Sequence, residues 1–176
     1  KLLENQLGFM QQYYDVTAIS SDKTNLERVG RLQGVSVFNV EMTRKITPLQ
    51  DLKAVWQLFS FFRREKPLIV HTHTPKAGTV GMIAAKLAGV PHRLHTIAGL
   101  PLLEAKGSRR KLLNLVERIT YAAATKIYPN SNGLQEIIIK EQFCKPEKLE
   151  VIGKGSSNGI NTSYFNPLLF SEEDKT

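Results

Sequence analysis

The segment Pro67-Leu-Ile-Val-His-Thr-His-Thr-Pro-Lys-Ala-Gly78 predicts a strand that leads directly into a helix. The run from Leu68 to Val70 is short, continuous and apolar, which is typical of a strand covered on both faces in a parallel sheet. Thr74 has the side chain of a helix cap, and Pro75 suits the first helical position because no backbone donor is needed there. We therefore expect the helix to begin at the carboxyl end of the strand.

Polar side chains gather at this junction. His71 and His73 alternate with a threonine, so they point to the same side of the strand. Ligands of open α/β sheets bind outside the carboxyl ends of the strands, where a helix amino terminus favours negative charge and Lys76 adds a cation. The pattern predicts a site for an anionic ligand. Two alternatives stay open: a rim of hydrogen-bonded polar side chains without a ligand, and a zinc site, which is disfavoured because no third metal ligand lies nearby in the sequence.

The next predicted strand, residues 91–97, brings further polar groups to the same place. His95 lies near its end, and Ala98-Gly99 forms the loop at its exit. The exits of parallel strands share one edge of a sheet, so both strands are expected to contribute to one cleft. Small residues in the intervening helix allow it to approach the sheet or a ligand closely. The predicted ligand-binding set is His71, His73, Lys76, Gly78, His95 and Gly99.

The remaining segments alternate between strand and helix patterns, which predicts an α/β domain with a mostly parallel sheet flanked by helices in three layers. Further strands are expected at 14–20, 35–42, 126–131 and 149–152, and helices at 1–13, 25–32, 48–66, 75–88, 109–125 and 132–143, with a turn at 21–24. Two helical stripes are interpreted as core packing rather than as binding surfaces. They are Leu52, Val55, Trp56, Phe59 and Phe62 in one helix, and Leu112, Leu115, Val116 and Ile119 in another.

The segment from Leu100 to Lys111 combines leucines with positive charges. If Ser108 caps the following helix, three cations occupy its first turn, where the helix dipole disfavours them by about 0.3 to 1 kcal/mol each. We expect this segment to touch an anionic membrane, with three leucines entering the interface. The alternative is a set of solvated cations beside a loop. The residues involved are Leu100, Leu102 and Leu103, and Lys106, Arg109, Arg110 and Lys111.

Composition narrows the class of protein further. A chain of 176 residues, 41% of them hydrophobic, is long enough for one well-packed domain, and its single cysteine, Cys144, cannot form an internal disulfide. The formal charge of +8 predicts an anionic partner, but no helix-turn-helix, zinc-finger spacing or basic stripe with stacking aromatics indicates nucleic acid. No apolar run approaches the length of a membrane span, so a cytoplasmic or peripheral protein is expected. Neither a phosphate-binding glycine loop nor a G-x-S-x-G elbow is present.

Three motifs together resemble the amino-terminal, acceptor-side domain of GT-B glycosyltransferases of family 4, of the bacterial polysaccharide or lipopolysaccharide type. His71-Thr-His-Thr-Pro-Lys-Ala-Gly78 is similar to the family's fourth-strand motif, and His95-Thr-Ile-Ala-Gly-Leu-Pro101 is similar to its fifth-strand loop. Asn158-Gly-Ile-Asn161, with Phe165 and Pro167, resembles the segment that crosses into a second domain. Ala98 stands where many relatives have a histidine, so the resemblance assigns no catalytic base.

The resemblance implies half of a GT-B enzyme that transfers a sugar with retention, from a nucleotide diphosphate sugar to a lipid-linked glycan acceptor. It implies that residues 1–154 form the acceptor-side domain without its first strand, and that 155–176 lead toward a missing carboxyl-terminal donor domain. The family's glutamate pair, separated by seven residues, is absent from this sequence, so no cofactor or donor is expected to bind here and the chain alone should be inactive. A peripheral position on the inner face of the cytoplasmic membrane is expected. The alternative is a stand-alone, non-catalytic α/β module that binds an anionic ligand.

Overall fold

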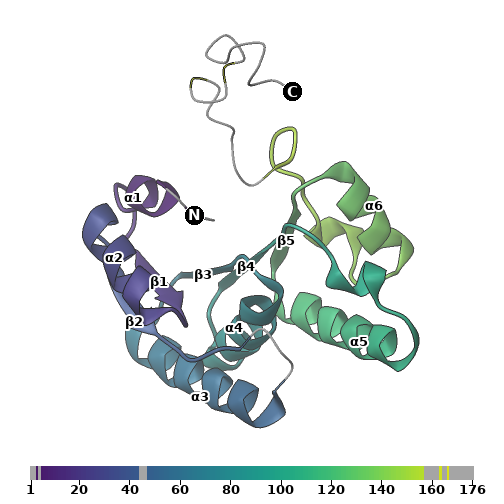
Figure 1. Ribbon diagram of the computed structural model, residues 1–176, viewed down its shortest axis with the longest axis horizontal. Helices are drawn as coiled ribbons and strands as arrows, with labels where there is room; N and C mark the ends of the chain where they lie inside the picture. The colour runs from purple at the N-terminus through teal and green to yellow at the C-terminus, as the bar shows by residue number, and fades with distance from the viewer. Residues whose placement is uncertain (1–2, 4, 44–46, 157–162, 164–165, 167–176) are drawn as a thin grey trace, which may run out of the picture.

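The computed structural model describes residues 3, 5–43, 47–156, 163 and 166, and helices alternate with parallel strands through most of this range (Figure 1). The crossing segment predicted from residue 158, and most of the predicted linker, lie outside the described residues. The elements are α1 (Gln6–Met10), β1 (Thr17–Ser20), α2 (Lys23–Gln33), β2 (Ser36–Asn39), α3 (Pro48–Glu65), β3 (Ile69–Thr72), α4 (Pro75–Ala88), β4 (His92–Ile97), a 3-10 helix η1 (Pro101–Glu104), α5 (Gly107–Ala123), β5 (Lys126–Pro129), α6 (Asn132–Lys140) and a 3-10 helix η2 (Pro146–Lys148).

All strand pairs among the described residues are parallel. One sheet pairs β1 with β2, and the other has the order β3-β4-β5. The fold class predicted from the sequence, a parallel α/β arrangement flanked by helices, is therefore confirmed. The strand predicted at 149–152 contributes only an isolated bridge between Ile127 and Leu149. The opening helix is also much shorter than predicted, because α1 spans only Gln6–Met10 and buries none of its residues.

The junction between β3 and α4 forms as its residues predict. The Thr74 side chain accepts a hydrogen bond from the amide of Ala77, and Pro75 takes the first helical position. At the other end, Gly89 has a φ of 78°, a left-handed conformation that ends the helix at low cost for glycine. These local signals place the start of α4 directly at the carboxyl edge of the sheet.

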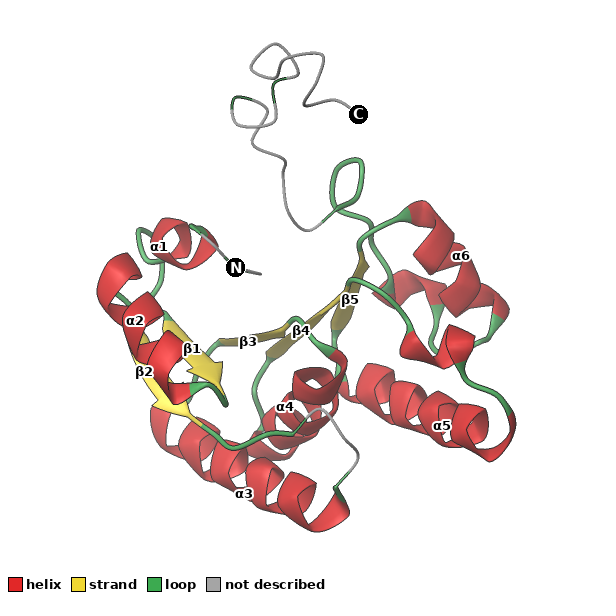
Figure 2. Ribbon diagram, viewed as in Figure 1, coloured by secondary structure: helices red, strands yellow, loops and turns green. Residues whose placement is uncertain are grey.

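Helices α3, α4 and α5 lie along the same side of the three-stranded sheet (Figure 2). The core lies between them and the strands, and it includes Leu58 and Phe62 of α3, Met82 of α4 and Ile127 of β5. Phe61 of α3 stacks on Phe38 of β2, with ring centroids 4.0 Å apart, and so connects the smaller sheet to the same core. One face of each sheet is thereby sealed by helices.

The opposite face of β3 is less covered than the sequence predicts. Leu68 is 59% exposed, and along the strand Val70 and Thr72 are buried whereas His71 is exposed. The prediction of a strand buried on both faces is therefore wrong. Alternate side chains of a strand point to opposite faces, so the residues that face α4 are buried and those between them are not.

Both predicted helical stripes are only partly buried. In α3 the core contacts come from Ala54, Leu58, Phe61 and Phe62, while Leu52 and Trp56 are exposed. In α5 the prediction fails more completely, because Leu112, Leu115 and Ile119 are 45%, 55% and 44% exposed. The buried residues of α5 are Glu117, Thr120, Tyr121 and Ala123. Helix α5 thus buries a mixed face, in which Glu117 and Thr120 lie beside Tyr121 and Ala123, and it leaves three residues of the predicted stripe exposed.

Candidate functional site

His71 lies at the end of β3 on the open face of the sheet. Its Nε2 atom is 2.8 Å from the hydroxyl of Thr96 on β4, at hydrogen-bonding distance. Its ring lies 4.1 Å from the ring of His73, centroid to centroid, and 6.1 Å from that of Tyr128 on β5. The two imidazoles predicted from their spacing to share one side do lie together.

His95 lies at the same edge but on the other face of the sheet. It pairs in register with Thr72, and its Nδ1 atom is 2.8 Å from the Thr72 hydroxyl. The ring is 3% exposed and is packed against α4 at Gly78. A methyl group added to Gly78 would come within 2.9 Å of His95 Nε2 and closer still to Cε1. Gly78 therefore makes room for the His95 ring, and it lines neither of the hollows described below.

Two adjoining hollows open at this edge, and His73 lines both. The first, of about 220 Å³, lies on the open face and is lined by His71, Thr96 and Tyr128, together with residues of α1 and of the segment 152–156. The second, of about 210 Å³, lies beside the start of α4 and is lined by His95, Gly99 and Glu117. The structure thus brings four predicted residues to one edge of the sheet, but it divides them between two hollows.

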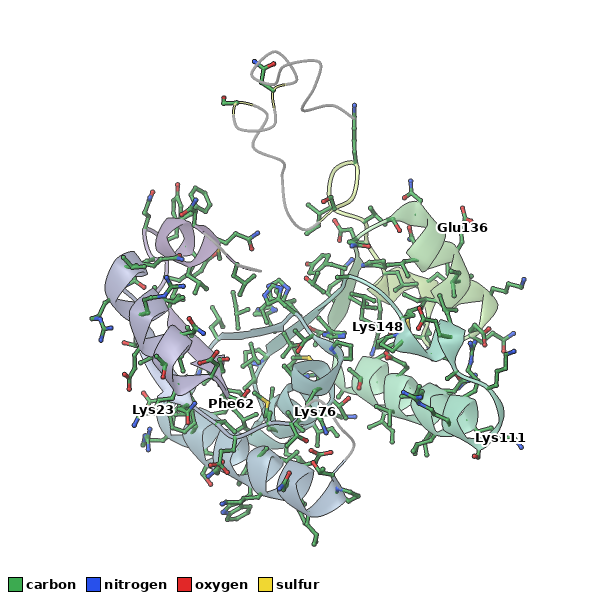
Figure 3. All side chains as sticks on the ribbon, viewed as in Figure 1. Lys23, Phe62, Lys76, Lys111, Glu136 and Lys148 are labelled. Carbon is green, nitrogen blue, oxygen red and sulfur yellow. The ribbon has the colours of Figure 1, made fainter. Side chains whose placement is uncertain are left out.

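Lys76 does not contribute its charge to these hollows. Its ammonium group lies 2.7 Å from both carboxylate oxygens of Asp51 on α3, and the Lys76 side chain is only 18% exposed. Figure 3 shows Lys76 between α4 and α3. The prediction that Lys76 lies with the imidazoles is therefore wrong, because its ammonium group is paired with Asp51 in the first turn of α3.

The imidazoles supply little positive charge either. Burial lowers the pKa of His95 to about 4, and burial also lowers the pKa of His73. His71 is more exposed, but the packing of its ring beside His73 and Tyr128 desolvates it, and this desolvation, together with the neighbouring His73 and His95, lowers its pKa. Each ring is therefore neutral near pH 7, and each can act as one hydrogen-bond donor and one acceptor. The site is polar and carries no cation among the residues described above.

Glu117 is the site residue that sequence reasoning missed. It lies in the middle of α5, is 8% exposed and lines the second hollow with His73 and His95. Burial raises the pKa of its carboxyl group. The signal for Glu117 in the sequence is its spacing, because it shares a helical face with Thr120 and Tyr121, opposite the leucines predicted to be buried.

The segment from Leu100 to Lys111 differs from its predicted role. Leu100 and Leu102 are buried in the core, so they cannot enter a membrane. Arg110 is bound within the protein, donating to the backbone oxygen of Leu102 at 2.6 Å and pairing with Glu141 at 2.9 Å. Ser108 does not cap α5, which begins one residue earlier at Gly107.

Three cations of that segment, Lys106, Arg109 and Lys111, are exposed, and Figure 3 shows Lys111 near the start of α5. Within the described residues, no three histidine, cysteine, aspartate or glutamate side chains are grouped so that they could hold a metal ion. Nor does any helix in that part of the chain combine the length and apolarity needed to cross a membrane.

Comparisons with known proteins identify the family. The glycosyl transferase 4-like domain matches residues 7–155. The capsular polysaccharide biosynthesis glycosyltransferase CapM of Staphylococcus aureus is 36% identical over 165 residues, which is 93% of this chain and 43% of that protein. The UDP-Gal:alpha-D-GlcNAc-diphosphoundecaprenol alpha-1,3-galactosyltransferase of Escherichia coli is 35% identical over 129 residues, 73% of this chain and 32% of that protein.

The solved structure of a glycosyltransferase from Rickettsia africae has the same fold, with a TM-score of 0.64 and 19% identity over 98% of this chain and 42% of that one. The chain spans less than half the length of the curated relatives it matches. The match over residues 7–155 and the identity to CapM place this chain in the glycosyl transferase 4-like domain family.

Proposed function

We propose that this chain is the acceptor-binding part of a retaining glycosyltransferase, which moves a sugar from a nucleotide diphosphate sugar to a lipid-linked glycan acceptor. The family match over residues 7–155 is the observation that carries the proposal. The E. coli relative is named for a UDP-galactose donor and a diphosphoundecaprenol-linked acceptor, and the S. aureus relative for capsular polysaccharide biosynthesis. By extension from those names, the proposed role of this chain is in making a bacterial surface polysaccharide, such as a capsule or lipopolysaccharide.

The two hollows support the acceptor-binding role. They lie outside the carboxyl ends of β3 and β4, where α/β sheets bind ligands. Their polar groups include neutral imidazoles and hydroxyls, which suit the hydroxyl groups of a glycan because each can donate or accept a hydrogen bond, and the carboxyl group of Glu117, which can accept one. His73 lines both hollows, as do Thr96 and Ala98, so a ligand that spans both would contact it.

We assign the donor to a carboxyl-terminal domain beyond this sequence. The sequence supports this assignment, since it has neither a glycine-rich phosphate loop nor two glutamates at the family's separation. Holding two substrates in one geometry can supply about 7 to 11 kcal/mol of the barrier reduction. A chain that binds one substrate alone forgoes that contribution, so it is expected to be inactive by itself.

The outward face of α5 supports a position at the membrane surface. Leu112, Leu115 and Ile119 recur at helical spacing and are all more than two-fifths exposed. Arg109 and Lys111 flank this apolar face within the first turns of α5, and both are exposed. A basic residue near an anionic membrane contributes about 1 kcal/mol, and buried apolar area adds to it. This surface takes the place of Leu100 and Leu102, which are buried, whereas Leu103, the third leucine named from the sequence, is 46% exposed.

Ligand titrations of the chain test the acceptor-binding role. N-acetylglucosamine linked through a diphosphate to a short prenyl chain should shift the amide resonance of Gly99, whereas UDP-galactose at equal concentration should not. The variant His73→Ala should weaken acceptor binding, and the control His92→Ala, at the amino end of β4 and exposed, should leave it unchanged. Sub-micromolar binding of UDP-galactose, or sugar transfer by the chain alone, would contradict the assignment of the donor.

A second measurement separates an enzyme from a non-catalytic binding module. The longer protein that contains this chain should transfer a sugar to the lipid-linked acceptor, and the anomeric configuration of the product tests retention. Absence of transfer from every nucleotide sugar offered, with binding of phosphorylated ligands preserved, would favour the module.

Vesicle sedimentation tests the membrane surface. The chain should bind vesicles with anionic lipids more strongly than neutral vesicles, and both Leu115→Gln and Arg109→Gln should reduce this binding. Leu32→Gln is the matched control, because Leu32 is 74% exposed on α2, a different helix. Equal binding to both kinds of vesicle, or equal effects of Leu115→Gln and Leu32→Gln, would remove this part of the proposal.

A further inference from the structure

The hollow beside α4 contains two deeply buried groups that can form hydrogen bonds. His95 is 3% exposed and Glu117 is 8% exposed, and both line this hollow together with His73 and Gly99. His95 comes from a strand exit and Glu117 from the middle of α5, so two separate elements aim polar side chains at one place. The hollow is therefore built by the tertiary fold and not by a single loop.

The polar groups of His95 and Glu117 differ in how far they are already bound within the protein. Among the described residues, the Tyr121 hydroxyl is the only buried polar side-chain group that is enclosed without a hydrogen-bond partner. His95 uses Nδ1 for Thr72, and no ion pair joins Glu117 to a described cation. The Nε2 atom of His95 lies on the side of the ring that packs against Gly78 of α4. The carboxyl group of Glu117 interacts with the hydroxyl of Tyr121 on the same helix, and it keeps further acceptor positions for a ligand in the hollow that it lines.

The charges around this hollow argue against an anionic ligand. A helix amino terminus such as that of α4 favours anions, but a carboxylate facing the same space repels them. Lys76, in the first turn of α4, is paired with Asp51, and Arg118, which follows Glu117, donates to the backbone oxygens of Glu141 and Gln142. The lowered pKa values of His73 and His95 keep both rings neutral near pH 7. A phosphate in this hollow would meet the acidic side chain of Glu117, whose pKa is raised by burial, and no positive charge among these residues.

We propose that the hollow beside α4 binds an uncharged sugar ring, with the Glu117 carboxylate accepting hydrogen bonds from its hydroxyl groups and excluding phosphate. Carboxylates act only as acceptors, and sugar hydroxyls are donors that can satisfy a buried carboxylate without an ion pair. Pro75, Ile97 and Ala98 provide apolar lining for the carbon-bearing face of the ring. That the ring belongs to the acceptor rests on the proposed function. The acceptor's diphosphate would then lie outside this hollow.

Two soluble probes test the preference for an uncharged ring. The neutral probe is methyl N-acetylglucosaminide and the charged probe is N-acetylglucosamine 1-phosphate, each titrated into the chain and followed at the amide resonances of Thr74 and Gly99. We expect the neutral probe to bind about tenfold or more tightly than the charged one, since like charges at a binding site cost several times the energy of thermal motion.

The variant Glu117→Gln tests the role of the carboxylate. The substitution should lower the affinity for the neutral probe about tenfold, because a charge-assisted hydrogen bond is lost, and it should raise the affinity for the charged probe. Glu136→Gln, on the exposed surface of α6, should change neither. If Glu117 were merely structural, Glu117→Gln would change the unfolding midpoint and leave the ratio of the two affinities unaltered.

Three results would overturn the inference: tighter binding of the charged probe by the unmodified chain, no shift of either resonance with the neutral probe, or an unaltered affinity ratio in Glu117→Gln. These results are separate from the transfer assay. Binding of the neutral probe without sugar transfer by the longer protein would leave this inference standing and remove the proposed enzyme. Sugar transfer by the longer protein, with an unaltered affinity ratio in Glu117→Gln, would support the proposed enzyme and overturn this inference.

Discussion

Replacing Gly78 by alanine tests the packing that shapes the site. The added methyl group would come within 2.9 Å of His95 Nε2, so the ring must retreat by roughly 0.6 Å there to reach an ordinary contact distance. The ring has little freedom to do so, because it is 3% exposed and its Nδ1 atom is 2.8 Å from the Thr72 hydroxyl. Overpacking of this kind costs about 1 to 3 kcal/mol.

The substitution of Gly78 by alanine also stabilises the helix, and this gain offsets part of the overpacking cost. Alanine is better than glycine inside a helix by about 0.5 to 1 kcal/mol, and Gly78 lies inside α4. We therefore expect a net loss of about 1 to 2 kcal/mol in the free energy of unfolding. Gly133→Ala is the matched control, since Gly133 lies in α6 and an added methyl group would meet no atom within 4 Å. That variant should be neutral or more stable.

Urea unfolding followed by circular dichroism measures both variants at pH 7. A double variant with His95→Ala makes the test specific, because removal of the ring should relieve the clash and produce a coupling of more than about 0.5 kcal/mol. The His95 ring proton resonances should also move in Gly78→Ala and not in Gly133→Ala. If Gly78→Ala were as stable as Gly133→Ala, the His95 ring would not be held against α4 and the described geometry would be wrong.

The remaining predictions concern pH and charge. The pKa of His95 is about 4 in the folded chain against about 6.5 when unfolded, so the unfolded state binds its proton more readily. Stability should therefore fall by about 3 kcal/mol as pH drops from 6.5 toward 4, and His95→Gln should flatten this dependence in urea unfolding measured across that range. Arg110→Gln should cost about 1 to 3 kcal/mol in the same assay because it loses buried partners, whereas Arg109→Gln should stay within about 0.5 kcal/mol. Asp51→Asn should lower stability by about 1 kcal/mol, since it removes a partly buried ion pair, and should leave binding of methyl N-acetylglucosaminide unaltered.

Much of the fold could be predicted from the sequence because its signals are local. Thr74, Pro75 and Gly89 set the ends of α4 through hydrogen bonds and backbone angles that involve only near neighbours in the chain. The common side of His71 and His73 follows from the alternation of a strand. The alternation of strand and helix segments likewise predicts a parallel sheet, since parallel strands need a crossover between them.

The composition of the site was decided by contacts between distant segments. Lys76 pairs with Asp51, 25 residues earlier, and this contact removes the expected cation from the hollows. His95 reaches the same sheet edge as His71 but the opposite face, because its register with Thr72 turns it toward α4. No local pattern indicates either arrangement.

Helix α5 shows most clearly why the sequence could not predict which side chains are buried. Its sequence contains an apolar stripe, and the usual inference is that such a stripe packs inward. An apolar stripe shows only that one face of a helix is apolar, whereas the neighbouring elements of the fold determine which face is covered. Here α4 packs against the face with Glu117, Thr120 and Tyr121, and the Thr120 hydroxyl donates to that of Thr79 on α4, whereas Leu115 on the opposite face remains exposed. The sequence alone thus determined where the helices and strands lie along the chain, and only the tertiary structure decided which of their faces are buried and which side chains meet in the site.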